Sequence, residues 1–302
     1  MTCTTGSDLG QGGAGPILCP MSRPVAPVVD FYSRHPISES QIIDALRRQG
    51  KDLKRLAPED LYDFDQDHYG GLEAVEALGR RAGIDASSRV LDVCAGLAGP
   101  ARFMARRWGA RVTGVDLNPD RAAGGRRLSA AVGLGALVRM VRGDAQVLPF
   151  RGQAFTAVVS QEGLLHVPDK ATTLAECRRV LLPGGRIAFS DWIATARLGD
   201  GERRRLDEWM AAVTLQSIES YKALLAGAGF VAIGAEDLSS DWMVVLRKRL
   251  EMFRGLKADT VSRLGPARYD EYDQLYAFFV GLVEAGKLGG ARFSATAGPG
   301  AF

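Results

Sequence analysis

Short apolar runs and helical patterns alternate through the middle of the chain. Buried strands are expected near residues 89–93, 111–115, 137–141, 155–160, 185–190 and 229–234. Helices are expected between them, near residues 99–108, 118–132, 170–181 and 218–228. Strands that alternate with helices form parallel sheets covered on both faces, because each crossover places a helix against the sheet. The pattern therefore predicts an α/β protein with a doubly wound, Rossmann-like sheet.

The segments on either side of this alternation have a different pattern. Before it, Ser38 and Gln41 have the spacing of a helix capping box, and a second helix is expected from Leu72 to Ala82. After it, apolar spacings predict two amphipathic helices, around 246–256 and 272–279, and a closing edge strand near 289–295. We therefore divide the chain into a disordered tail (1–24), an N-terminal helical lid (25–84), a core (85–238), and C-terminal helices with the closing edge strand (239–302).

Composition narrows the class of protein without giving a function. The 302 residues are 46% hydrophobic, enough for a large core, and the net charge of +3 is too small to indicate nucleic-acid binding. No apolar run approaches the ~18 residues that a membrane span needs. The four cysteines have neither a CxxC pair nor the spacing of a metal site, which favours a reduced, cytoplasmic protein with no bound metal.

Acidic residues stand at the ends of the first three predicted strands. Asp92 lies near the end of the first strand, Asp116 ends the second and Asp144 follows the third. The carboxyl ends of parallel strands meet at one edge of the sheet, where nucleosides bind in such folds. No G-x-G-x-x-G run directly follows the first strand, which disfavours a nicotinamide dinucleotide. An acid ahead of Gly96 and Gly99 instead suits a ligand with positive charge, and S-adenosylmethionine carries a sulfonium and an amino group.

Three further segments carry a resemblance to a known family. They are Ser160–Lys170 (SQEGLLHVPDK), Leu182–Arg186 (LPGGR) and Ser190–Trp192 (SDW). With the acids, they resemble class I S-adenosylmethionine-dependent methyltransferases over residues 65–236. Within that family the chain resembles the sarcosine/dimethylglycine N-methyltransferase group of small-molecule enzymes. The resemblance implies a methyltransferase sheet with an N-terminal helical lid and a C-terminal helical extension, and S-adenosyl-L-methionine as the cofactor.

The resemblance also assigns residues to the cofactor. The predicted cofactor-binding residues are Tyr69, Asp92, Ala95, Gly96, Asp116, Leu117, Asp144, Ala145 and Gln161. Asp116 matches the acid that binds the ribose, and Asp144 the acid on the adenine side. Two positions depart from the family pattern, because Cys94 and Ala98 stand where glycine is usual. A positive φ at either position would strain the backbone.

His166 is the leading candidate for catalysis, with Gln161 placed beside it. In the family motif this histidine lies near the transferring methyl, where it orients the nucleophile or takes its proton. The structural alternative is a packed histidine bonded to the backbone. Tyr32, Arg34 and Trp192 are the candidates for substrate contact. An aromatic in the lid can face the sulfonium, and Arg34 can pair with a substrate carboxylate.

The resulting hypothesis is N-methylation of a small amino acid or amine. S-methylation of a thioether amino acid such as methionine stays open. So does C- or O-methylation of a quinone or natural product, which would favour a wider, more apolar pocket. A catalytically silent S-adenosylmethionine-binding protein and an oxidoreductase are the alternatives from other classes. The expected partner is a small-molecule methyl acceptor, without nucleic acid or membrane, and a homodimer is left open.

Overall fold

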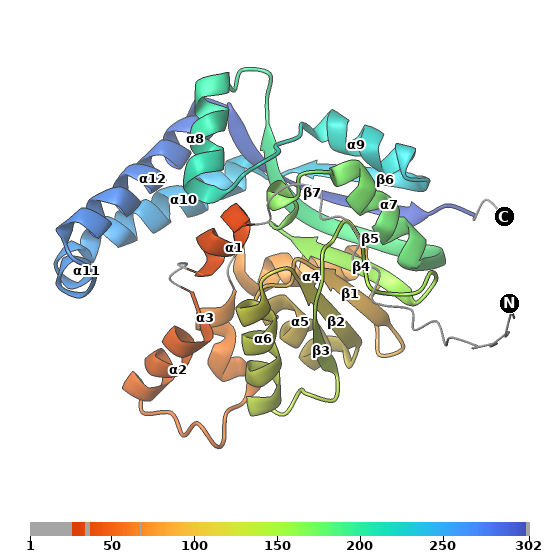
Figure 1. Ribbon diagram of the computed structural model, residues 1–302, viewed down its shortest axis with the longest axis horizontal. Coiled ribbons are helices and arrows are strands. Elements are labelled where there is room, and N and C mark those ends of the chain that lie inside the picture. The colour runs from red at the N-terminus through yellow and green to blue at the C-terminus, as the bar shows by residue number, and fades with distance from the viewer. Residues whose placement is uncertain (1–25, 34–36, 67, 300–302) are drawn as a thin grey trace, which may run out of the picture.

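The computed structural model describes residues 26–33, 37–66 and 68–299. Within these ranges, seven strands form one sheet in the order β3-β2-β1-β4-β5-β7-β6 (Figure 1). Their bounds are β1 (Arg89–Val93), β2 (Arg111–Asp116), β3 (Val138–Arg142), β4 (Phe155–Gln161), β5 (Leu181–Ala194), β6 (Phe230–Asp237) and β7 (Leu288–Ala297). The neighbours among β1–β5 are parallel, and β7 is antiparallel to both of its neighbours. The predicted doubly wound, Rossmann-like sheet is therefore confirmed.

Helices cover both faces of the sheet and extend beyond its edges. Those before and within the core are α1 (Ala26–Ser33), α2 (Glu39–Arg48), α3 (Tyr62–Asp65), α4 (Gly71–Arg81), α5 (Gly99–Trp108), α6 (Pro119–Ala131) and α7 (Lys170–Val180). Those that follow are α8 (Asp200–Met210), α9 (Ile218–Gly227), α10 (Ser239–Gly255), α11 (Lys257–Leu264) and α12 (Pro266–Glu284). Short 3-10 turns lie at Pro58–Leu61 (η1) and Leu164–His166 (η2).

Successive residues of the central strand belong to opposite layers. Val90 packs in a cluster that includes Leu78 of α4 and Met104 of α5. Its neighbour Leu91 packs with Leu174 of α7 and other residues from the far side. A strand buried on both faces needs apolar residues at successive positions, which explains the run in β1.

The N-terminal helices lie beside the carboxyl ends of the strands (Figure 1). The predicted cap of α2 is present, since the backbone N–H of Gln41 donates to Ser38 Oγ at 3.4 Å. Residues 1–24, predicted as a disordered tail, and Arg34 lie outside the described residues. The division into a lid, a core and a C-terminal extension stays a prediction.

The C-terminal strand corrects one expectation. Residues near 289–295 do form a strand, but β7 lies between β5 and β6 rather than at the edge of the sheet. Both faces of β7 are largely covered and Phe293 is fully buried, whereas β6 at the edge alternates with exposed residues. An inserted position therefore buries more of the apolar surface of β7 than an edge position would. None of the described helices is long and apolar enough to cross a membrane.

Candidate active site

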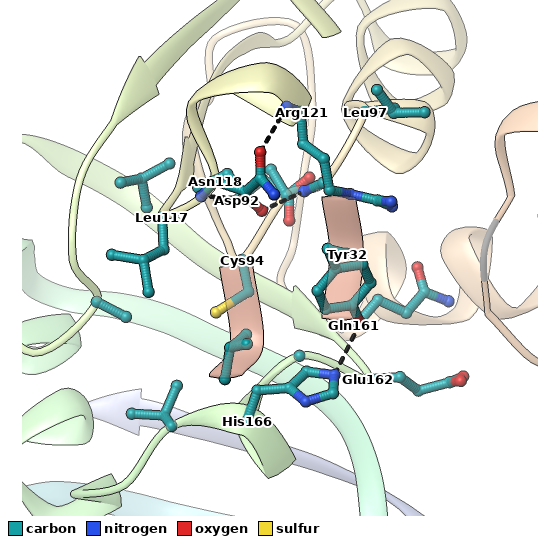
Figure 2. A pocket seen from close by; sticks show the side chains of 18 of the residues that line it. Tyr32, Asp92, Cys94, Leu97, Leu117, Asn118, Arg121, Gln161, Glu162 and His166 are labelled. Carbon is teal, nitrogen blue, oxygen red and sulfur yellow. Dashed lines mark hydrogen bonds between the residues drawn. The ribbon is translucent and has the colours of Figure 1, made fainter. Parts of the chain in front are cut away.

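The carboxyl ends of β1, β2 and β4 surround a cavity that we call the sheet pocket. The chain crosses from one side of β1 to the other between β3 and β4, and ligands of α/β sheets bind at such a reversal. Of the predicted residues, the lining includes Tyr32, Asp92, Ala95, Gly96, Asp116, Leu117, Asp144, Ala145, Gln161 and His166. The three acids predicted at successive strand ends therefore line one cavity. Figure 2 shows Asp92 in this cavity.

The turn after β1 brings the backbone to the pocket surface through left-handed conformations. Cys94 has φ +59°, Gly96 has φ +54° and Ala98 has φ +63°. The strain expected where cysteine and alanine replace glycine is thus present at both positions. α5 begins directly after this turn, so its N-terminus faces the pocket.

Asp116 is held by two backbone groups. The N–H of Gly96 donates to its Oδ2 at 2.7 Å, and the N–H of Asn118 donates to its Oδ1 at 2.9 Å. Burial raises the pKa of Asp116, while these two N–H groups and the Arg121 guanidinium act in the opposite direction. A carboxylate has about four acceptor sites, so Asp116 can still accept hydrogen bonds from ligand hydroxyls.

Asp92 is a buried acid whose charge is not compensated by the described residues. Its Oδ2 has no hydrogen-bond partner among them, and only 2% of the residue is exposed. Burial, with a smaller contribution from the nearby Asp116, raises the pKa of Asp92 to about 8. A cationic group bound in the pocket would stabilise the ionised form of this carboxyl. The amino group and sulfonium of S-adenosylmethionine fit that requirement.

Asp144 has a structural role as well as a place in the pocket lining. The backbone N–H of Gln146 donates to its Oδ1 at 2.8 Å, which fixes the turn after β3. Asp144 therefore stabilises the turn and also lines the pocket.

Tyr32 and His166 are joined across the pocket by a hydrogen bond (Figure 2). The Nδ1 of His166 lies 2.9 Å from the carbonyl oxygen of Ala211, which can only accept, so Nδ1 carries the hydrogen. The Nε2 is then the acceptor of the Tyr32 hydroxyl, at 2.7 Å. The guanidinium of Arg121 lies 4.6 Å from the centre of the Tyr32 ring, on its face. The hydrogen bond to the backbone that the structural alternative requires is therefore present. It leaves the Nε2 of His166 as a basic nitrogen directed at the pocket.

A second cavity of about 960 Å³, which we call the helical cavity, adjoins the sheet pocket. The two share lining residues, which are Tyr32, His68, Glu162, His166 and Val213. The rest of the helical cavity is lined mainly by residues of α8 and α12, and α10 contributes Arg249. The hydrogen-bonded pair of tyrosine and histidine therefore lies in the wall where the two cavities meet.

Two predicted residues lie in this second cavity and not in the sheet pocket lining. Trp192, expected to contact substrate, lines the helical cavity. Tyr69 was expected at the cofactor, but it also lines the helical cavity, with its ring centre 5.5 Å from that of Trp192. The guanidinium carbon of Arg249 in α10 lies over the Tyr69 ring, 4.5 Å from its centre. The Nη2 of Arg249 also donates to the carbonyl of His68. Helix α10 thus holds Tyr69 on the side away from the sheet pocket.

Sequence reasoning assigned no role to Glu162. Glu162 is 9% exposed, has φ +53°, and its Oε1 accepts from the backbone N–H of Tyr69 at 2.8 Å. Strained, buried acids of this kind concentrate at functional sites. The Nδ1 of His68 lies 3.1 Å from the Nε2 of Gln161. The Oε1 of Gln161 has no hydrogen-bond partner in the described part of the chain. The available signal for Glu162 was its place between Gln161 and His166 in the same motif.

Comparisons with known proteins agree with this geometry. Residues 91–189 match the family described as "Methyltransferase domain". The methyltransferase GfsG of Streptomyces halstedii is 30% identical over 67% of this chain and 80% of its own length. The 27-O-demethylrifamycin SV methyltransferase of Amycolatopsis mediterranei is 30% identical over 61% of this chain and 69% of that protein.

Other relatives are longer than the stretch that matches. The glycine/sarcosine/dimethylglycine N-methyltransferase of Actinopolyspora halophila is 29% identical over 63% of this chain, which spans only 34% of that protein. A solved structure of Haemonchus contortus phosphoethanolamine N-methyltransferase 2, in complex with phosphomonomethylethanolamine and S-adenosylhomocysteine, has a TM-score of 0.74 at 20% identity. It covers 91% of this chain and 61% of that one.

The matched relatives, the doubly wound sheet and the acid-lined pocket lead to the same assignment. The expected resemblance to methyltransferases, including the sarcosine/dimethylglycine group, is confirmed, as is S-adenosylmethionine as the cofactor of the family. The chain belongs to the S-adenosylmethionine-dependent methyltransferases.

Proposed function

We propose that this enzyme methylates a hydroxyl group of a small-molecule acceptor, and that His166 receives the proton of that group through Tyr32. The observation that carries the proposal is the 2.7 Å hydrogen bond between Tyr32 and His166 in the wall between the two cavities. When bound, S-adenosylmethionine supplies an electrophilic methyl group. The protein's own residues bind the cofactor, hold the acceptor and remove its proton.

The acids of the sheet pocket are the proposed cofactor ligands. Asp92 would bind the cationic methionine end, because the Oδ2 of its carboxyl lacks a hydrogen-bond partner in the described residues. Asp116 would accept from the ribose hydroxyls, and Asp144 would lie on the adenine side. Ala95, Gly96, Leu117, Ala145 and Gln161 complete the proposed set. Each of these residues lines the same pocket.

The proton path follows from the tautomer of His166. The neutral Nε2 accepts from the Tyr32 hydroxyl, and that hydroxyl oxygen can in turn accept from an acceptor O–H. In the proposed transfer the methyl carbon would exchange its bond to the sulfonium sulfur for a bond to the acceptor oxygen. The proton of that hydroxyl would pass to Tyr32, and the Tyr32 proton would pass to His166. Such proton transfer contributes about 10²–10⁴-fold to rate, and positioning of the acceptor contributes further.

An amine acceptor, the expectation from the sequence, is the second candidate. The buried carboxylate of Glu162 lies in the shared wall, where it can bind a cationic amine before deprotonation. A thioether acceptor has no proton to lose, so the Tyr32–His166 pair would have no proton to accept in that reaction. A homodimer and a cytoplasmic location stay predictions.

The test has two stages. Calorimetric titration with S-adenosylmethionine is expected to show one binding site, and absence of binding up to millimolar cofactor would instead support a silent protein. Transfer of labelled methyl into a panel of alcohols, phenols, amines and thioethers, read by mass spectrometry, then identifies the acceptor atom. Transfer to thioethers alone would overturn the proposal.

A further inference from the structure

The helical cavity is much larger than a small amino acid requires. Its volume is about 960 Å³, near the upper end of the roughly 300–1,000 Å³ typical of ligand sites. At about 30 Å³ for each molecule of liquid water, it corresponds to roughly thirty waters. A molecule such as glycine or sarcosine would leave most of this volume to solvent beside the reacting group.

The chemistry of the lining changes with depth. Buried apolar and aromatic residues form the interior, and they are Tyr69, Leu165, Trp192 and Phe279. Partly buried residues continue the apolar wall, and they are Trp209, Met210, Leu275 and Tyr276. Exposed charged or polar residues stand around them, and they are Asp207, Glu208, Arg268, Glu271 and Gln274. The inner end is polar again, where Tyr32, Glu162 and His166 adjoin the sheet pocket.

The apolar wall is built by helices outside the nucleoside-binding sheet. Trp192 at the end of β5 packs against Phe279 of α12, with ring centres 5.8 Å apart. Trp209 of α8 packs against Phe278 of α12 at 5.5 Å. Figure 1 shows α8, α10 and α12 grouped to one side of the sheet, next to α1. Since α1 carries Tyr32, these helices place the apolar wall of the helical cavity next to Tyr32 and His166, the proposed proton acceptors.

We propose that the acceptor is a large, mostly apolar molecule of natural-product size. It would present one hydroxyl to Tyr32 at the inner end of the helical cavity, rest its hydrocarbon or ring surface on the aromatic wall, and keep its other polar groups at the charged rim. Such a molecule matches the lining at each depth, whereas a small zwitterion matches only the inner end. The inference rests on the proposed function, and it replaces the small amine expected from the sequence.

A matched pair of variants tests the assignment. Met210→Trp adds bulk to a residue that lines the helical cavity, whereas Met252→Trp makes the same change at a side chain that is 61% exposed on α10. The probe is 1-anilinonaphthalene-8-sulfonate, added to protein saturated with S-adenosylhomocysteine and followed by energy transfer from tryptophan. We expect one probe per chain, binding weakened at least tenfold in Met210→Trp, and binding unchanged in Met252→Trp.

Competition and turnover experiments then separate the proposed methyl transfer from the inferred size and polarity of the acceptor. A hydroxylated macrolide and a sterol are expected to displace the probe, whereas glycine, sarcosine and ethanolamine leave it bound at millimolar concentration. The inference is overturned if no probe binds, if Met210→Trp binds it as well as Met252→Trp, or if small amines are methylated equally by both variants. Probe binding without cofactor binding would defeat the proposed methyl transfer while leaving an apolar-ligand cavity. Cofactor binding with turnover of small amines would leave methyl transfer standing but defeat the assignment of a large apolar acceptor.

Discussion

Arg102 and Asp65 form an ion pair in which neither side chain is exposed to solvent. The Arg102 Nη2 lies 2.7 Å from Asp65 Oδ2, and Nη1 also donates to the hydroxyl of Ser129 at 3.2 Å. Arg102 belongs to α5, which follows the turn of the sheet pocket, and Asp65 ends α3. Asp65 also lines that pocket. The pair therefore ties the N-terminal segment to the core beside the sheet pocket.

Removal of one partner of this pair is predicted to destabilise the fold strongly. Arg102→Met should lower the free energy of unfolding by about 3–5 kcal/mol, because it leaves Asp65 buried without its counter-charge. Urea denaturation measures the loss. The double variant Arg102→Met with Asp65→Leu should recover much of it, since no uncompensated charge is left.

An exposed ion pair of the same type is the control. Arg254 contacts Asp273 at 2.6 Å, with half of the arginine side chain exposed. Arg254→Met should leave the urea midpoint nearly unchanged, because solvent screens exposed pairs. Equal losses in the two arginine variants would contradict the role of burial.

The proton path predicts a loss of rate when either His166 or Tyr32 is changed. His166→Gln should lower the rate of methyl transfer about 10²–10⁴-fold, because it removes the proton acceptor. Tyr32→Phe should also reduce kcat, with little change in the affinity for S-adenosylhomocysteine. Tyr62→Phe, a change of the same type in η1–α3 outside both cavities, is the control. A kcat within twofold of the native value in both His166→Gln and Tyr32→Phe would refute the proton path.

The raised pKa of Asp92 predicts a pH-dependent stability. Burial raises the pKa of this carboxyl in the folded chain to about 8, from 3.8 as its ordinary value. The folded state therefore binds the proton more tightly than the unfolded state. The stability from this proton is complete below about pH 4 and is lost as the pH rises through 8, at up to about 1.4 kcal/mol per unit.

The variant Asp92→Asn isolates that contribution. Relative to Asp92→Asn, the native protein should lose stability between pH 5 and pH 8, as measured by urea denaturation at both values. Cofactor binding near pH 7 should release close to one proton from the native protein and none from the variant, by calorimetry in buffers of different ionisation enthalpy. A parallel pH dependence of the two proteins would disprove the assignment.

Gly163 and Cys94 are predicted to depend on each other. A Cβ built on Gly163 would overlap the Cβ of Cys94, although the φ of −113° at Gly163 suits any residue. Gly163→Ala should therefore cost about 1–3 kcal/mol of stability and weaken cofactor binding. Cys94→Gly added to Gly163→Ala should restore most of both. No rescue in the double variant would show that the cost has another source.

The acids of the sheet pocket could be predicted because their placement is local. Asp92, Asp116 and Asp144 each follow from the end of a strand, and parallel strands bring those ends together. The left-handed turn at Cys94 and Ala98 was likewise visible as small residues between a strand and a helix. These features need no knowledge of distant packing.

Features that depend on distant packing could not be predicted. Tyr69 lies in the helical cavity because Arg249, 180 residues further along the chain, packs on its ring. The width of that cavity depends on how α8 and α12 meet around Trp209. The position of β7 inside the sheet also requires its pairing with both β5 and β6. Alternating residues indicate a strand but not its neighbours.

The inserted position of β7 has a consequence for the order in which the sheet is completed during synthesis. β6 reaches the rest of the sheet only through β7, to which it is antiparallel. A growing chain that ends before Leu288 therefore carries β6 with no neighbouring strand, while β1–β5 can already pair. An unpaired strand is a site of aggregation. The interval between synthesis of β6 and of β7 is therefore a stage at which the growing chain is open to aggregation through this strand.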